Sequence, residues 1–233
     1  MALPKSNAPT QQYYRSGIHL EAMLDLEDCT RDLLPSIATH NEHFASLLAQ
    51  DDKLQALSIK AYARLLWADN HLDNLVRDLS ADLKKIDRHQ PTLRAHERFF
   101  PEGGFAGVIQ PSGRAVSSEI DTLRKRFPVL DDLSSQAPEL AAHLQSLEAA
   151  CKTAEAALAA VTRLDQQRAQ LSVEADILRN AWRTAAYQIE GELNRRFPGR
   201  KDIVRDFFYS PSSESSTATA SDAPTPPSPN QPS

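Results

Sequence analysis

Two histidines are the first residues whose type and position could support chemistry. His40 and His143 close two copies of the pattern Pro-x-x-Ala-x-His, which begin at Pro35 and Pro138. Histidines on facing helices can bind a metal in the core of a helical bundle, usually together with a Glu-x-x-His motif. That motif does not occur in the sequence. We therefore expect no metal and no cofactor, and we interpret both histidines as ordinary residues of helices.

The segment 101–113 has the glycine content of a phosphate-binding loop but not its spacing. A Walker loop needs four residues between its glycines, followed by Lys and then Ser or Thr. Here five residues separate Gly107 from Gly113, and Arg114 and Ala115 follow. Apolar residues in and before this segment predict packing over one end of the helices or, alternatively, a contact surface for a partner. The candidate interaction residues are Phe99, Phe100, Phe105 and Ile109.

Basic residues form a second candidate surface near the end of the chain's last helical run. They are Arg195, Arg196, Arg200 and Lys201. Cations near a helix C-terminus offset the helix dipole, which is the ordinary role of such residues. The alternative interpretation is a site for an anionic ligand or for a membrane surface.

The other motifs of catalysis are missing from the sequence. It contains no Gly-x-Ser-x-Gly, no His-Glu-x-x-His, and no Cys/His cluster with zinc spacing. We therefore do not expect an enzyme, and a metalloprotein is disfavoured.

The composition narrows the class of protein further. A net charge of −5 removes the long-range attraction that non-specific nucleic-acid binding requires. No apolar run approaches the roughly 18 residues of a membrane span, and the first twenty residues lack the apolar core of a signal peptide. Cys29 and Cys151 stand alone, which is typical of a reducing compartment. We expect a cytoplasmic protein without a transmembrane segment.

Two long runs without proline or glycine predict the elements that position these residues. The runs are 36–90 and 139–190, and good helix formers fill both. Within them, apolar residues follow steps of three and four along two seams, 37–86 and 140–189. The mean step of about 3.5 residues is the coiled-coil period. Both seams keep their phase across the possible turns at 50–52 and 165–167. This continuity favours two helices of about 50 residues each over the alternative, a compact up-down four-helix bundle.

The two halves of the chain resemble each other, which predicts an internal repeat. The seams superpose at an offset of 103 residues, and the runs end alike at Arg98-Phe-Phe-Pro and Arg196-Phe-Pro-Gly. The predicted organisation is a flexible N-terminus (1–16), a helical domain (17–209) and a disordered Ser/Thr/Pro tail (210–233). The helical domain would contain half-repeats 18–101 and 114–209, joined by the Gly-rich connector 101–113. Shorter helices are predicted at 18–33 and 114–127, the second ended by Pro128.

Some positions in and beside the seams bear on how the helices pair. Asp51, Asp82 and Arg168 interrupt the seams, so they are expected at exposed rims or facing one another. Four apolar residues lie beside the seams and imply a further packing partner, either the short helices or a second chain: Leu66, Val76, Leu158 and Ile177.

These patterns together predict an all-α, pseudo-duplicated helical bundle or coiled coil with shorter flanking helices. We expect a non-enzymatic structural or protein–protein interaction protein that binds a protein partner or self-associates. The alternative is an anionic-ligand or peripheral membrane-surface binder that uses its basic helix ends.

Overall fold

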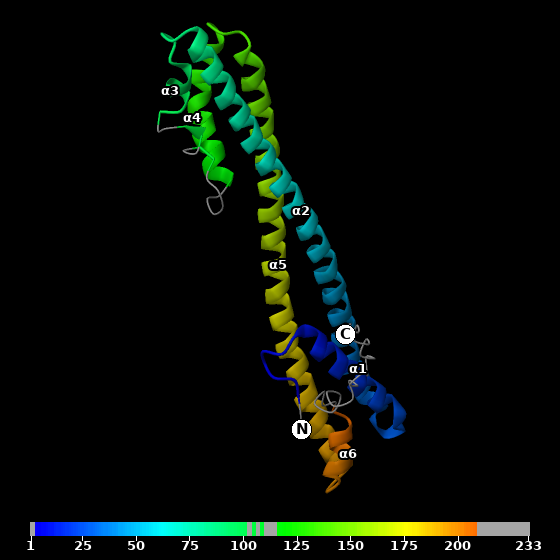
Figure 1. The fold of residues 1–233 in the computed structure, drawn as a ribbon. Coiled ribbons are helices and arrows are strands. Elements are labelled where there is room, and N and C mark those ends of the chain that lie inside the picture. The colour runs from blue at the N-terminus through cyan, green and yellow to red at the C-terminus, as the bar shows by residue number, and fades with distance from the viewer. Residues whose placement is uncertain (1–2, 102–103, 106–107, 110–115, 209–233) are drawn as a thin grey trace, which may run out of the picture. The chain divides into compact units, whose positions relative to one another are not determined.

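All the regular secondary structure in the described part of the chain is helical. The computed structural model describes residues 3–101, 104–105, 108–109 and 116–208. In order, the elements are α1 (Thr10–Leu26), the 3₁₀ helix η1 (Asp28–Leu33), α2 (Leu34–His89), α3 (Ala95–Phe99), α4 (Val116–Ser134), α5 (Leu140–Arg196) and α6 (Lys201–Asp206) (Figure 1). These residues contain no strand, which confirms the all-α fold class. None of the described helices is long and apolar enough to cross a membrane.

The two long helices predicted from the seams are both present and unbroken. α2 has 56 residues and α5 has 57, and each continues through its possible turn, at Asp51 and at Asp165. Neither turn offers Gly, Pro or Asn, so nothing in the local sequence stops the helix. α5 ends at Arg196, shortly before Gly199, whose φ of 79° suits a residue without a side chain.

The seams are the buried faces of the long helices. Every seam side chain from Ile37 to Ile86 and from Leu140 to Ile189 is buried or half-buried, except Asp51 and Arg168. Those two are exposed, which is one of the two alternatives that the sequence analysis expected for the polar seam residues. The third polar seam residue, Asp82, instead contacts His143. The coiled-coil packing and the internal repeat stay predictions.

The first short helix begins earlier than expected. α1 starts at Thr10, so Thr10 to Ser16 of the predicted flexible N-terminus (1–16) are helical. Tyr13 is fully buried, and its hydroxyl donates a hydrogen bond to the carbonyl of Lys5 at 2.9 Å. Arg179 on α5 also donates to the carbonyl of Ala8. The predicted start was too late because an aromatic side chain, rather than the leucines further on, anchors the first turn.

The predicted end of the other short helix, at Pro128, is wrong. α4 runs from Val116 to Ser134 with Pro128 inside it. An internal proline removes one backbone hydrogen bond and crowds the preceding turn. Pro128 itself is exposed, whereas Leu130 and Leu133, which follow it, are fully buried. Burial of these leucines offsets the cost of the proline.

The chain divides into two compact units. Unit 1 consists of 1–48 and 175–233, and unit 2 of 49–174. In the core of unit 1, the ring of Tyr13 lies 5.4 Å from that of Trp182 in a T-shaped contact and 6.1 Å from that of Phe44. In unit 2, α2, α4 and α5 share one apolar core, which includes Leu72, Leu123 and Leu147. The predicted tail (210–233) and most of the connector (101–113) lie outside the described residues.

Candidate functional site

The aromatic residues before and within the connector belong mainly to the core of unit 2. Phe99, Phe100 and Ile109 are buried there, and the rings of Phe99 and Phe100 pack edge to face with centroids 4.8 Å apart. Phe105, by contrast, is 37% exposed. Of the four candidate interaction residues, the structure therefore offers only Phe105 to a partner.

The basic residues at the end of α5 are largely neutralised by acidic neighbours in unit 1. Arg195 pairs with Glu192 at 2.5 Å, and Arg200 pairs with Asp202 at 3.1 Å. Arg196 makes two hydrogen bonds to the carboxylate of Asp32, at 2.5 and 2.7 Å, and these bonds lower the pKa of Asp32. Lys201 is exposed. This pairing weakens the attraction that an anionic ligand would feel.

The two equivalent histidines have different environments. His40 is half-buried in unit 1, its Nδ1 has no hydrogen-bond partner in the structure, and burial lowers its pKa, with His43 lowering it further. His143 lies in unit 2 with its Nε2 2.9 Å from Oδ2 of Asp82. His143 is accounted for by its contact with Asp82 of α2, whereas His40 has no such partner at Nδ1.

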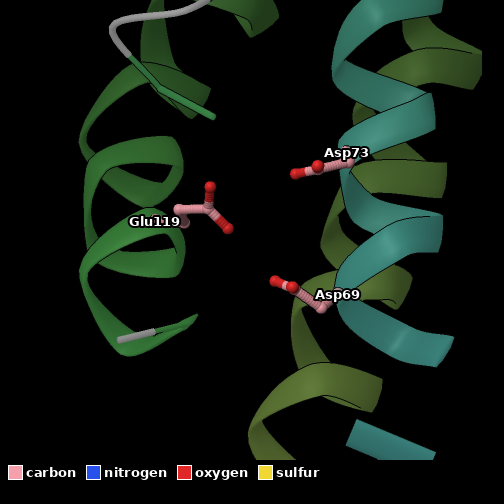
Figure 2. A group of neighbouring side chains, drawn as sticks. All are labelled: Asp69, Asp73 and Glu119. Carbon is pink, nitrogen blue, oxygen red and sulfur yellow. The ribbon is translucent and has the colours of Figure 1, made fainter. Parts of the chain in front are cut away.

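Three carboxylates meet between α2 and α4 in unit 2. Asp69 and Asp73, one turn apart on α2, face Glu119 from the first turn of α4 (Figure 2). An oxygen from each residue lies within 4.8 Å of the others, and Glu119 is buried. The sequence analysis missed this group, although the four-residue spacing of Asp69 and Asp73 places them on one helix face.

The electrostatics within this acidic group raise the pKa of Asp73. Burial raises the pKa of Asp73, and the neighbouring charge of Asp69 raises it further, whereas Arg77, at 3.4 Å, acts in the opposite direction. Three carboxylates fall short of the six to eight oxygen ligands that calcium takes. Protonation of Asp73 relieves its repulsion from Asp69.

A surface of α2 carries large apolar side chains exposed to solvent. Ile59, Tyr62 and Leu66 follow steps of three and four and therefore share one face of α2, and we call these three residues the exposed α2 surface. Leu57 and Trp67 are also exposed but lie on other sides of the helix. These five residues are between 41% and 65% exposed. The ring of Trp67 stacks on that of His71, with centroids 5.3 Å apart and planes 15° from parallel. Contiguous exposed apolar side chains are a mark of interaction surfaces, whereas scattered ones are ordinary.

The sequence analysis found only part of this surface. Of the apolar residues predicted beside the seams, Val76 is buried in the core of unit 2 and Leu158 is half-buried. Leu66 and, in unit 1, Ile177 are exposed. Ile59 and Tyr62 were missed, although Ile59, Tyr62 and Leu66 follow steps of three and four, the spacing of a second seam.

The exposed α2 surface is the strongest candidate site, because its large apolar side chains stay exposed in the described part of the chain. No family model, no curated protein and no solved structure matches this chain, so the geometry alone carries the assignment of a function.

Proposed function

We propose that this chain is a non-enzymatic interaction protein that binds a protein partner through the exposed α2 surface. One observation carries the proposal: three large apolar side chains, Ile59, Tyr62 and Leu66, lie exposed on one face of α2. Exposing them costs free energy in water, at roughly 25 cal/mol per Å² of apolar area. A partner that covers them recovers this free energy on binding.

The rival function, binding of anions or membranes by the basic helix ends, has weaker support. Arg195, Arg196 and Arg200 each pair with a nearby carboxylate. An anionic ligand would have to displace these carboxylates, and the attraction that remains would be screened by salt. The exposed α2 surface needs no such displacement. We place the interaction in the cytoplasm, because Cys29 and Cys151 are both free thiols.

Paired substitutions on the full-length chain test this function. In Tyr62→Ser/Leu66→Ser the apolar surface is lost, while the matched control Ile177→Ser removes an equally exposed apolar residue elsewhere. Partners captured with the wild-type chain are purified and their affinities measured. We expect the double variant to weaken binding at least tenfold and the control to bind like the wild type.

Two further measurements are needed to interpret the binding result. Urea unfolding of both variants verifies that they are folded, which is expected because the substituted side chains are exposed. Light scattering of the wild-type chain decides whether the partner is a second copy. If every captured partner binds the double variant as tightly as the wild type, or if no partner is captured, this function is wrong.

A further inference from the structure

We propose that two segments of this chain compete for one docking site in unit 1: residues 4–10, which fill the site in the structure, and residues 227–233 of the C-terminal tail. Docking of one segment leaves the other free. The site is formed by α1 and α5 within unit 1 and does not involve the exposed α2 surface, so it is independent of the proposed function.

The N-terminal segment is held on α5 through its backbone carbonyls. Arg183 donates to the carbonyl of Pro4. Arg179 donates to the carbonyl of Ala8 and to Oγ1 of Thr10, both at 3.3 Å. The side chains of Pro4 and Ala8 are buried. Because every residue has a backbone carbonyl, the two arginines select the path of the backbone and not one particular sequence.

Between these contacts the segment makes a β-turn. The amide of Ala8 donates to the carbonyl of Lys5 at 2.9 Å. The hydroxyl of Tyr13 on α1 donates to the same carbonyl, also at 2.9 Å. Ser6 and Asn7 occupy the two central positions of the turn, and both are exposed. A second occupant must therefore make a turn at the same distance from a buried proline.

The tail repeats the sequence features that the site uses. Pro4-Lys-Ser-Asn-Ala-Pro-Thr10 and Pro227-Ser-Pro-Asn-Gln-Pro-Ser233 share the pattern Pro-x-x-Asn-x-Pro followed by a hydroxyl residue, which occurs nowhere else in the chain. At the two central positions of the turn, the tail has Pro229 and Asn230. Proline is favoured at the first central position of common turns, and asparagine is a frequent turn residue. The tail thus carries a turn signal in register with the first proline and with the final hydroxyl.

The tail is long enough to reach the site within one chain. The carbonyl of Asp206, where α6 ends, lies 3.0 Å from Nε2 of His19 on α1. On an α-helix, the nine residues from His19 to Thr10 span about 14 Å. The 18 residues 209–226 precede the repeated pattern, and a flexible chain of this length spans about 23 Å on average.

One position makes the tail the weaker of the two occupants. Ala8 is only 7% exposed, and the corresponding residue of the tail is the larger Gln231. A longer side chain at a closely packed position costs free energy. We therefore expect the N-terminal segment to occupy the site most of the time. A protein that captured this segment would shift the occupancy toward the tail.

Paramagnetic relaxation measures docking of the tail in the full-length chain. A nitroxide is attached at Ser228→Cys, which corresponds to the exposed Lys5, in a Cys29→Ser background, and NMR relaxation is recorded for the amides of α5. We expect enhanced relaxation around Arg179 and Arg183. The enhancement should grow about threefold or more in Ala8→Gln, which weakens the N-terminal occupant, and in Gln231→Ala, which improves the fit of the tail.

Proline substitutions in the tail provide the matched control. Pro227→Ser/Pro232→Ser removes the pattern and should abolish the enhancement. Pro224→Ser/Pro226→Ser changes two tail prolines outside the pattern and should leave the enhancement unchanged. Urea unfolding verifies that Ala8→Gln is folded. Gln231→Ala keeps the test decisive in either case, because it leaves the N-terminal segment intact.

Three results would overturn the proposal. The first is the absence of enhancement around Arg179 and Arg183 in Gln231→Ala. The second is an equal effect of the two pairs of proline substitutions, which would mean that the tail contacts α5 without using the pattern. The third is enhancement that arises only between copies, detected by mixing nitroxide-labelled chains with isotope-labelled chains that carry no nitroxide.

Discussion

Asp82 of α2 and His143 of α5 are members of the two heptad seams, and their side chains meet with Nε2 of His143 2.9 Å from Oδ2 of Asp82. Lys85 donates to the other carboxylate oxygen of Asp82 at 2.6 Å. The hydrogen bond from Lys85, followed by that from His143, lowers the pKa of Asp82. A polar pair between two apolar seams favours one axial register, because a shift of either helix would leave a carboxylate against apolar side chains.

This contact predicts a small, pH-dependent loss of stability in Asp82→Asn. The lowered pKa means that the stabilisation is present above the ordinary pKa of 3.8 and is lost as pH falls through the lower folded-state value. Because Lys85 is exposed and Asp82 is only half-buried, water screens the contact, and we expect the variant to lose less than about 1 kcal/mol at pH 7. Urea unfolding at pH 7 and pH 3 measures the difference. Asp78→Asn, an exposed change on the same helix, is the control. A loss that is equal at both pH values would contradict this account.

In the acidic group of Asp69, Asp73 and Glu119, the substitution Asp73→Asn should change stability in the opposite direction, by stabilising the chain. The pKa of Asp73 is raised by burial and by Asp69, so its stabilising contribution is complete below 3.8 and is lost as pH rises through the folded-state value. At pH 7 the ionised carboxylate is unfavourable, and Asn removes that cost. The ion pair lost with Arg77 contributes only about 0.2–0.5 kcal/mol.

We therefore expect Asp73→Asn to be more stable than the wild type at pH 7, by up to about 1 kcal/mol. The gain should disappear below pH 4. Thermal unfolding over this pH range is the measurement. A variant that is less stable than the wild type at pH 7 would mean that the pair with Arg77, rather than repulsion from Asp69, dominates.

Close packing in unit 1 predicts a large effect of adding one methyl group. A Cβ at Gly17 of α1 would lie 1.9 Å from Oδ1 of Asn41 and 3.0 Å from Nε1 of Trp182. Asn41 is buried, and its Nδ2 donates to Glu21 at 2.6 Å, so its amide is not free to move aside. Overpacking of this kind costs about 1–3 kcal/mol.

Gly17→Ala should therefore destabilise the chain by about 1–3 kcal/mol in urea unfolding followed by the fluorescence of the buried Trp182. Gly191→Ala is the matched control, because nothing lies within 4 Å of the Cβ it would add to α5. That change should stabilise the helix by about 0.5–1 kcal/mol. Equal stability of the two variants would rule out the close approach of α1 to Asn41.

The long helices could be predicted from the sequence because the spacing of apolar residues along each seam depends only on neighbouring residues and not on the rest of the fold. The ends of the short helices could not be predicted in this way, because tertiary burial decides them. Leu130 and Leu133 extend α4 through Pro128, and Tyr13 anchors α1 at Thr10. In both places, the packing of side chains outweighed the local signal that the sequence offered.

The candidate site was predictable only in outline. Leu66 stood out because it lies beside a seam, but whether it is exposed depends on where α4 begins, which is set by the fold of unit 2. The sequence allowed two interpretations of Phe99 and Phe100: packing over one end of the helices, or a contact surface for a partner. Their burial in the core of unit 2 matches the packing interpretation. The acidic group was missed because Glu119 is fifty residues from Asp69 in the sequence, and only the packing of α4 brings them together.

The environments of the two cysteines predict very different rates of reaction with a thiol reagent. Cys29 is exposed, whereas Cys151 lies in the core of unit 2, and burial raises the pKa of its thiol to about 11. Since the thiolate is the reactive form, Cys151 should react with a disulfide reagent at pH 8 only when unit 2 opens. In Cys29→Ser, the remaining thiol should therefore stay unmodified under conditions that label the wild-type chain once within seconds.

The labelling rate of Cys151 also tests how α4 covers it. Leu123 of α4 is fully buried in the same core, and Leu123→Ala should cost about 2–5 kcal/mol through the cavity it leaves. If opening is in fast equilibrium, this loss raises the labelling rate of Cys151 by at least tenfold, because the open population grows with the free-energy change. Rapid labelling of Cys151 in Cys29→Ser alone, or a rate that Leu123→Ala leaves unchanged, would contradict burial of the thiol beneath α4.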